Sequence, residues 1–140
     1  MSKYRQFIFD SYQFDPATGK LELHYAFDDA LRLTEKYRFD FPYTQYDPAV
    51  LDRAIQALFF MAGTSYYKMY IPLEIIINQG ELDPDMAAFF SKTYQRGLGE
   101  FWYVNKLDPR TPVTFPSTSE HIDPLISNGH GVLVAVGGGK

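Results

Sequence analysis

The strongest constraint on the fold is a strict alternation of apolar and polar residues in the first part of the chain. In the segment 20–27, apolar residues occupy every second position: Leu21, Leu23, Tyr25 and Phe27. Lys20, Glu22 and His24 lie between them, and a period of two is typical of a half-buried strand. Similar alternation occurs at 4–9 and 31–41, with turn-forming residues at 15–19 and 28–30. The pattern predicts an antiparallel meander with one solvated face.

A helical period replaces the alternation after position 46. Asp47-Pro48 is typical of a helix start, because Asp accepts hydrogen bonds from free amides and Pro suits the first turn. Four apolar residues then follow at helical spacing: Leu51, Ile55, Leu58 and Ala62. The polar residues expected to lie away from this side are Asp52, Arg53 and Gln56. Gly63 is predicted to end the helix or to permit close packing.

A second helix is predicted after Asp83-Pro84, which repeats the same start signal. Its apolar side is expected to consist of Met86, Phe89, Phe90 and Tyr94, and Gly97 is a plausible C-cap. The segment 71–78 between the two helices is rich in Ile and predicts a short strand with Pro72 near its start.

These patterns predict an α+β fold in which the antiparallel meander packs against two main helices. We expect an N-terminal α+β domain over residues 1–107. The segment 108–131 is rich in Pro, Ser, Thr, Asn and Gly, which predicts a linker or extended loop. Residues 132–140 are expected to begin an α/β nucleotide-binding domain that is truncated within this sequence.

Composition excludes several functional classes. The 140 residues are 46% hydrophobic, which is too apolar for a disordered tail. The net charge is −4 without any basic run, so nucleic acid is not an expected partner. Cysteine is absent, and the three histidines lack metal-ligand spacing, so no metal site is predicted: they are His24, His121 and His130. With neither a signal peptide nor an apolar membrane span, a cytoplasmic protein is the expectation.

The last nine residues predict a phosphate-binding loop. A β-prone run, Val132 to Val136, leads directly into Gly137, Gly138, Gly139 and Lys140. Glycine amides that follow a buried strand can cradle a phosphate. Val134 occupies a position at which both a Walker A loop and a dinucleotide fingerprint require glycine, so both motifs are rejected. A flexible tail is the alternative.

The terminal stretch VAVGGGK resembles the opening of the loop of ATP-pyrophosphatase-type enzymes, in which Ser-Gly-Gly-x-Asp-Ser follows the first strand. AGTSYYKMYIP (62–72), GLGEFWYVN (97–105) and VAVGGGK (134–140) occur in the order found in a family of peptidoglycan-precursor epimerases. The chain is therefore identified as similar to the N-terminal part of the UDP-N-acetylmuramoyl-L-alanyl-L-glutamate epimerase (MurL) family. The loop's Asp-Ser pair is absent from this sequence.

The resemblance implies an ATP- and Mg²⁺-dependent epimerase that acts on a UDP-linked muramoyl dipeptide. ATP would activate the α-carboxylate of the terminal L-Glu as an acyl-adenylate and release pyrophosphate. Loss of the carboxylate charge acidifies the neighbouring Cα–H, so that a base can remove the proton and an acid can return it to the other face. Hydrolysis would then give D-Glu and AMP. The catalytic residues remain unidentified, and the 140 residues alone are expected to be inactive.

Two stretches supply candidate substrate-binding residues. In SYYK, Lys68 can pair with a phosphate or carboxylate, and a hydroxyl of Tyr66 or Tyr67 can donate a hydrogen bond. The alternative is a lysine at a helix C-terminus beside packed aromatic rings. In GEFWYVN, Glu100 and Asn105 flank aromatic residues and are candidates for binding, whereas the alternative places Glu100 exposed at the head of a strand with Trp102 in the core.

Two other functions remain open at this level. The chain could be a self-contained binding or interaction domain whose aromatic residues, 17% of the total, form an ordinary core or a ligand groove. It could also be the first part of another ATP-pyrophosphatase-type ligase, which would share the glycine loop but lack the SYYK and GLGEF stretches.

Overall fold

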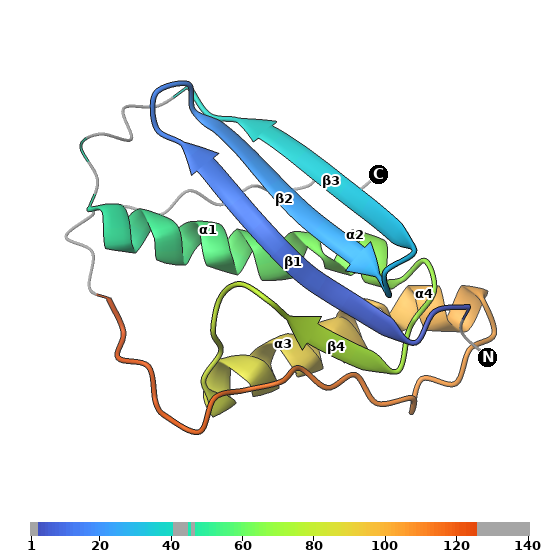
Figure 1. The fold of residues 1–140 in the computed structure, drawn as a ribbon. Coiled ribbons are helices and arrows are strands. Elements are labelled where there is room, and N and C mark those ends of the chain that lie inside the picture. The colour runs from blue at the N-terminus through green and yellow to red at the C-terminus, as the bar shows by residue number, and fades with distance from the viewer. Residues whose placement is uncertain (1–2, 41–44, 46, 126–140) are drawn as a thin grey trace, which may run out of the picture.

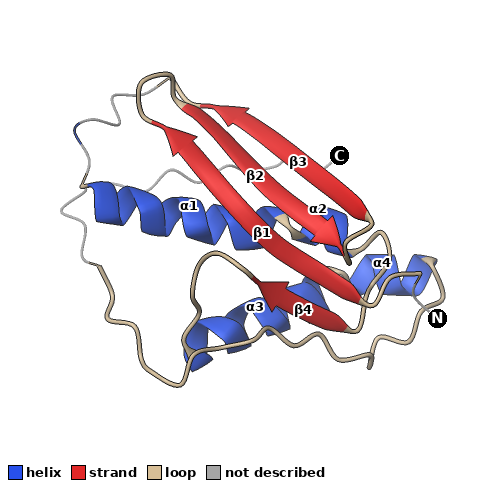
Figure 2. Ribbon diagram, viewed as in Figure 1, coloured by secondary structure: helices blue, strands red, loops and turns tan. Residues whose placement is uncertain are grey.

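The computed structural model describes residues 3–40, 45 and 47–125 and shows an α+β fold (Figure 1). Its sheet contains four strands in the order β3-β2-β1-β4: β1 (Gln6–Asp15), β2 (Lys20–Phe27), β3 (Leu31–Arg38) and β4 (Glu74–Ile77). The first three pair in antiparallel fashion and confirm the predicted meander. The fourth lies within the predicted strand 71–78 and runs parallel to β1, which makes the sheet mixed (Figure 2).

The two faces of the sheet differ in polarity as the alternation predicts. The helix-covered face carries six fully buried side chains: Phe7, Phe9, Leu21, Leu23, Tyr25 and Phe27. The open face carries charged pairs, among them Lys36–Glu22 at 2.9 Å and Arg32–Asp10 at 3.5 Å. His24 lies on this face, and its Nδ1 is 3.0 Å from the Thr34 hydroxyl. Solvent therefore remains on one side of the sheet only.

Both predicted helix starts are confirmed. In α1 (Pro48–Ala62), the Asp47 carboxylate accepts a hydrogen bond from the Ala49 amide at 2.8 Å. In α3 (Pro84–Gly97), the Asp83 carboxylate accepts one from the Met86 amide at 2.8 Å. These carboxylates satisfy amides that have no partner within the helix. Two short helices follow the main ones: α2 (Thr64–Tyr67) and α4 (Gly99–Val104).

Two side chains occupy helix faces opposite to those predicted. Gln56 was expected to lie away from the core, but it is only 5% exposed and its Nε2 donates to the Glu81 carbonyl at 2.7 Å. Phe89 was expected on the apolar side of α3, yet it is 57% exposed. Ala87 is buried in place of Phe89, because the buried face of α3 consists of Ala87, Phe90 and Tyr94.

Close packing at Gly63 joins α1 and α3 to the sheet. A Cβ at this position would lie 2.5 Å from the ring of Phe9 and 2.8 Å from the Tyr94 hydroxyl oxygen. The Tyr94 hydroxyl donates to the Phe60 carbonyl at 2.5 Å, and burial raises the pKa of Tyr94 above its ordinary range. Gly63 thus both ends α1 as its C-cap and permits close packing, so both roles predicted for it are confirmed.

The segment after α4 is extended and packs on α3. Residues 108–125 contain no helix or strand, but Val113 and Phe115 are almost fully buried in the core. The Val113 amide donates to Gln95 Oε1 at 3.0 Å, and the Phe115 amide donates to Ser91 Oγ at 2.9 Å. The core therefore continues past the boundary predicted at residue 107. The rest of the predicted linker and the strand and glycine loop at 132–140 lie outside the described residues.

None of the helices in residues 3–40 and 47–125 is both long and apolar enough to cross a bilayer. Over the same residues, no group of three or more His, Asp or Glu side chains is arranged to hold a metal ion.

Candidate functional site

A groove of about 950 Å³ lies at the end of the molecule where β1 begins. Its wall is built from the residues before β1, the end of β2, the connection from α2 to β4, and α4 with the loop that follows it. Two predicted site residues, Lys68 and Asn105, line this groove although they are 37 positions apart in the chain.

Aromatic side chains form part of the lining of the groove. The rings of Tyr4 and Tyr70 meet edge to face with centroids 4.7 Å apart, and Tyr70 also contacts Phe27 of the core at 5.0 Å. Trp102, another lining residue, is 2% exposed and its indole N–H donates to the Gln95 carbonyl at 3.0 Å. Rigid aromatic walls of this kind suit a ligand with an apolar or planar part.

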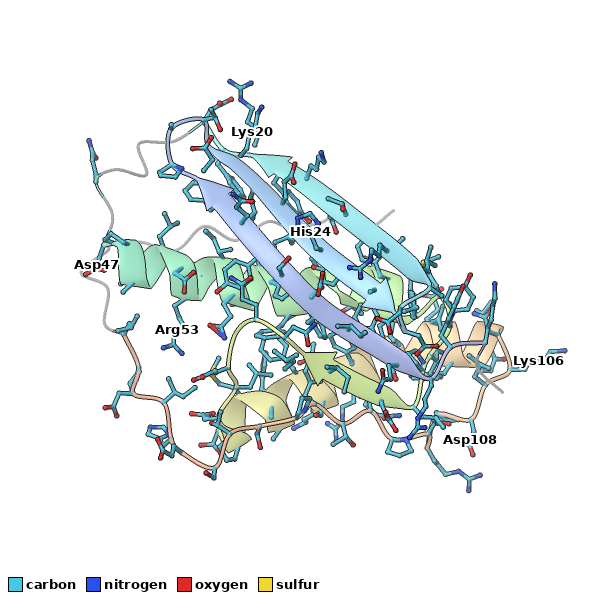
Figure 3. The ribbon with its side chains drawn as sticks, viewed as in Figure 1. Lys20, His24, Asp47, Arg53, Lys106 and Asp108 are labelled. Atoms are coloured by element: carbon cyan, nitrogen blue, oxygen red, sulfur yellow. The ribbon has the colours of Figure 1, made fainter. Side chains whose placement is uncertain are left out.

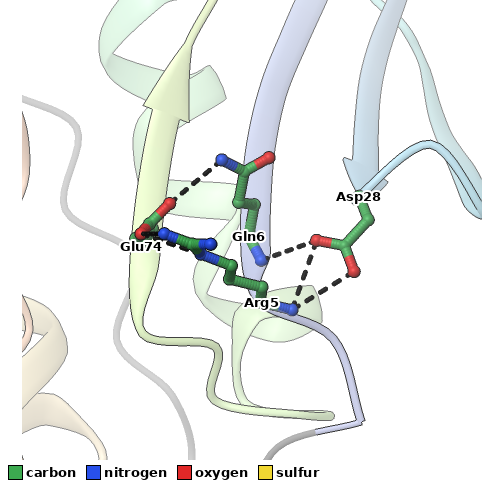
Figure 4. A network of polar contacts seen from close by, with 4 residues as sticks. All are labelled: Arg5, Gln6, Asp28 and Glu74. Carbon is green, nitrogen blue, oxygen red and sulfur yellow. Dashed lines mark hydrogen bonds and ion pairs between the residues drawn. The ribbon is translucent and has the colours of Figure 1, made fainter.

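A polar network fixes one rim of the groove (Figure 4). The Arg5 guanidinium pairs with the Glu74 carboxylate at 2.7 Å, and Gln6 Nε2 donates to the same carboxylate at 3.0 Å. The Asp28 carboxylate accepts the Gln6 amide at 2.8 Å and the Arg5 amide at 3.2 Å. The hydrogen bonds from Gln6 and then Arg5 hold the pKa of Glu74 below its usual range. This network joins β1, β2 and β4.

Backbone strain is concentrated at the same place. Among the described residues, three non-glycine residues have positive φ angles: Asp28 at 47°, Ile71 at 47° and Lys106 at 55°. Asp28 and Ile71 line the groove, and Lys106 lies between two residues that do. A β-branched residue with positive φ is unusual, since its Cβ crowds the backbone. Such strain persists where surrounding contacts enforce it and is frequent at functional sites.

The carboxylates of the groove already have partners, whereas the ammonium group of Lys68 has none among the described residues. Asp28 and Glu74 belong to the network above, and Asp108 pairs with Arg110 at 3.0 Å, which lowers the Asp108 pKa. Within the described residues, no ion pair or hydrogen bond engages the exposed Lys68 ammonium. An anionic group that enters the groove would therefore pair with the free ammonium of Lys68. Lys106 and Asp108 lie at the same end of the molecule (Figure 3).

The tyrosines of SYYK lie outside the groove. Tyr67 is 1% exposed, its hydroxyl donates to the Pro72 carbonyl at 3.4 Å, and burial raises its pKa to about 12. Tyr66 is half-buried with its ring 5.0 Å from Tyr25. The pKa of Tyr66 is raised by burial and by the nearby Glu35 carboxylate. The two neighbouring tyrosines thus face different surroundings, as their adjacency predicts.

Glu100 occupies the first turn of a helix and not the head of a strand, so that part of the alternative interpretation is wrong. Its side chain is exposed and does not line the groove. Trp102, from the same stretch, is in the core as that interpretation expected. The phosphate-loop residues Gly137, Gly138, Gly139 and Lys140 lie outside the described residues.

Sequence reasoning missed Arg5, Asp28, Ile71 and Glu74 as groove residues. One signal was available for Glu74, which is a lone charge within an otherwise apolar strand. Asp28 gave no such signal, because an aspartate in a turn is common for purely local reasons.

Comparison with known proteins identifies the family. The chain matches the model of the MurL N-terminal domain over residues 1–140, and it belongs to this family. It is 34% identical over 131 residues to the UDP-N-acetyl-alpha-D-muramoyl-L-alanyl-L-glutamate epimerase of Xanthomonas oryzae pv. oryzae. It is 32% identical over 143 residues to the epimerases of the same name from Salinispora tropica and a Micromonospora species. No solved structure matches the chain.

The alignments cover most of this chain but a minor part of the relatives. They include 90% of the chain and 29% of the Xanthomonas protein. For the Salinispora protein the corresponding shares are 96% and 31%. The described fold and its groove therefore correspond to less than a third of each of these enzymes.

Proposed function

We propose that the chain is the N-terminal domain of an enzyme that epimerises the terminal L-Glu of UDP-MurNAc-L-Ala-L-Glu to D-Glu, in the synthesis of peptidoglycan precursors. The observation that carries this proposal is the similarity of nearly the whole chain to three epimerases of that name. The ordered stretches AGTSYYKMYIP and GLGEFWYVN support it, because both border the groove described above.

The proposed mechanism activates a carboxylate with ATP. The α-carboxylate oxygen attacks the α-phosphorus of ATP, and pyrophosphate leaves. The acyl-adenylate no longer carries the carboxylate charge, so the adjacent Cα–H becomes acidic enough for a general base. After reprotonation on the other face, water cleaves the acyl-adenylate and releases AMP. Gly137, Gly138, Gly139 and Lys140 would contact the phosphates of ATP with Mg²⁺, because glycine amides and a lysine suit an anionic ligand.

The groove would serve as one wall of the substrate site. The free ammonium of Lys68 suits a phosphate or carboxylate of the substrate, and the Asn105 side chain offers further hydrogen bonds. Tyr67 is not part of this proposal, since its buried hydroxyl already has a partner. Tyr66 and Glu100 are also left out, because neither lines the groove.

The test uses the full-length enzyme that carries this chain, supplied with ATP, Mg²⁺ and UDP-MurNAc-L-Ala-L-Glu. We expect D-Glu after acid hydrolysis of the product and one AMP for each turnover, both quantified by chromatography. Absence of D-Glu would refute the epimerase. AMP without D-Glu would identify an ATP-pyrophosphatase-type ligase of another kind, and ADP in place of AMP would contradict adenylation.

The contribution of the groove is tested with Lys68→Met in the same enzyme. Loss of the cation should raise KM for the UDP-linked substrate by about tenfold while KM for ATP stays constant. Lys92→Met is the matched control, because Lys92 is an exposed lysine of α3 that does not line the groove. Equal kinetic parameters for both variants would exclude Lys68 from the substrate site.

A further inference from the structure

Large apolar side chains are exposed together around the mouth of the groove. Leu73 is 78% exposed, Met69 51% and Leu107 38%, and all three line the groove. Tyr103 and Val104 are 85% and 65% exposed in the last turn of α4, directly before Asn105. Met69, Leu73 and Leu107 form a surface that we call the apolar rim, and Tyr103 and Val104 are exposed in the neighbouring helix α4. Several large apolar side chains exposed around one groove mark a contact surface more often than an ordinary solvated one.

The open face of the sheet differs from the apolar rim, and this difference supports the interpretation of the rim as a contact surface. The open face of the sheet is also uncovered, but it carries charge pairs such as Lys36–Glu22. At the rim, Leu73 follows the positive φ of Ile71 and the buried Pro72, and it is the most exposed of the three apolar residues that line the mouth of the groove.

The size of the relatives indicates what covers the rim. The matched region is 29% to 32% of each relative, so more than two thirds of those polypeptides lie outside it. The charges at the rim restrict the chemistry of that partner. Glu74 and Asp108 are already paired, whereas the Lys68 and Lys106 ammonium groups are engaged by no ion pair within the described residues. A complementary surface would be apolar with carboxylates at its edge.

We propose that the apolar rim is the surface on which this domain docks against the remaining part of the same epimerase polypeptide, through an apolar surface that offers a carboxylate to Lys106. The proposal rests on the proposed function, since it takes the rest of the enzyme as the occupant. Docking there would cover the mouth of the groove and place it between two parts of the enzyme. Substrate sites are frequent in such positions, because closure excludes water.

Hydrogen exchange tests the docking directly and without turnover. One cluster of buried residues extends from Phe7 to Phe115, so the chain can be studied alone and within the full-length enzyme. Amides of the segments 69–74 and 99–107 should exchange at least about tenfold more slowly in the full-length enzyme. Amides of β2 and β3 near the open face should exchange at similar rates in both. Equal exchange of the rim in both forms would overturn the proposal, whether or not the enzyme epimerises its substrate.

Substitutions separate docking from other occupants. Leu73→Asp should leave the melting temperature of the isolated chain unchanged but abolish the slow exchange of the rim in the full-length enzyme and reduce kcat/KM by about tenfold or more. Phe89→Asp is the matched control, because Phe89 is also 57% exposed but does not line the groove. It should leave exchange at the rim and kcat/KM unchanged. Protection of the rim in the isolated chain that grows with concentration would instead identify a second copy as the occupant and refute docking within one polypeptide.

Discussion

At the residue scale, Gly63 is the position at which one added methyl group should cost most. Gly63→Ala would place Cβ 2.5 Å from the Phe9 ring and 2.8 Å from the Tyr94 hydroxyl, both in the packed core. We expect a loss of about 1–3 kcal/mol in the free energy of unfolding, because both neighbours would have to shift. Denaturant titration of the isolated chain measures this loss.

Gly97→Ala provides the matched control in α3. Nothing lies within 4 Å of a Cβ built at Gly97, and this residue is within the helix. Alanine should raise the free energy of unfolding by about 0.5–1 kcal/mol, since it restricts the unfolded chain and favours the helix. If both glycine variants were equally destabilised, the steric account of Gly63 would be wrong.

Asp83 should make stability depend on pH. Its carboxylate accepts the Met86 amide at 2.8 Å and the Ile122 amide at 3.3 Å, and it lies 3.2 Å from the His121 ring. The amide hydrogen bonds, foremost that from Met86, and the His121 ring lower the pKa of Asp83 below 3.8. A lowered carboxyl pKa stabilises the fold above 3.8, and this stabilisation is lost as pH falls through the folded-state pKa.

Asp83→Asn isolates this effect, because asparagine can still cap the helix without a charge. The variant should melt at a lower temperature than the wild type at about pH 7, and the difference should shrink towards about pH 3. Thermal unfolding followed by circular dichroism measures both curves. A difference that stayed constant over this range would exclude the charge as its cause.

Residue-level predictions succeeded where the cause is local. Asp47-Pro48 and Asp83-Pro84 specify helix starts through contacts within one turn, so their outcome does not depend on the rest of the fold. Gln56 and Phe89 were placed wrongly because helical spacing leaves the edge of an apolar stripe undefined. The acceptor that draws Gln56 inward is the carbonyl of Glu81, which is 25 positions away.

At the element scale, the extended segment after α4 should be as important for stability as a helix. The Phe115 ring contacts four core rings: those of Phe9, Phe60, Phe90 and Tyr94, at 5.5, 6.3, 5.7 and 4.9 Å. Phe115→Ala should lower the free energy of unfolding by about 3–5 kcal/mol, because a cavity would remain between the sheet and α3. Urea titration measures the loss.

Limited proteolysis tests whether the same segment is held in place on the folded domain. Cleavage between residues 108 and 118 should be slow in the wild type and fast in Phe115→Ala, because only the wild type holds the segment on α3. Thr114→Ala, at the exposed neighbouring position, should behave like the wild type. Rapid cleavage of the wild-type segment would show that the packing of Phe115 does not hold it in solution.

The nature of α4 could not be read from its sequence. Phe101, Trp102 and Tyr103 favour a strand by intrinsic preference, and the stretch is too short to show a helical period. Tertiary contacts decide the outcome, because burial of Trp102 and its hydrogen bond to Gln95 require a helical turn there. Asn105, a candidate for substrate binding from the same stretch, follows α4 and lines the groove.

At the scale of the whole molecule, the described domain should be unable to turn over ATP by itself. The chain corresponds to about a third of the epimerases that it resembles. We expect no AMP from ATP with the purified 140 residues, with the full-length enzyme as the positive control. Substrate-stimulated release of AMP by the chain alone would show that it contains a complete nucleotide site.

The sheet topology illustrates what sequence patterns leave undetermined. The meander follows from alternation and short turns, which are local. The parallel pairing of β4 with β1 is not local, because it joins Gln6 to Glu74. Neither strand carries a sequence pattern that identifies its partner. The groove has the same origin, since four separate segments meet there. Lys68 and Asn105 were selected as candidate substrate-binding residues by their residue types, whereas their placement around one groove could come only from the fold.

β4 is synthesised long after its partner β1, and this order has a consequence during translation. β1 is an interior strand, yet the residues of its neighbour β4 are made 68 positions after the residues of β1 with which they pair, as in Gln6 and Glu74. During translation at about 5–20 residues per second, a nascent chain would display an unpaired strand edge for several seconds. Pairings between distant segments also form slowly, because closing a long loop costs entropy before any contact is gained. The ribosome-bound intermediate is therefore the stage at which this protein would be most vulnerable to aggregation and most dependent on chaperones.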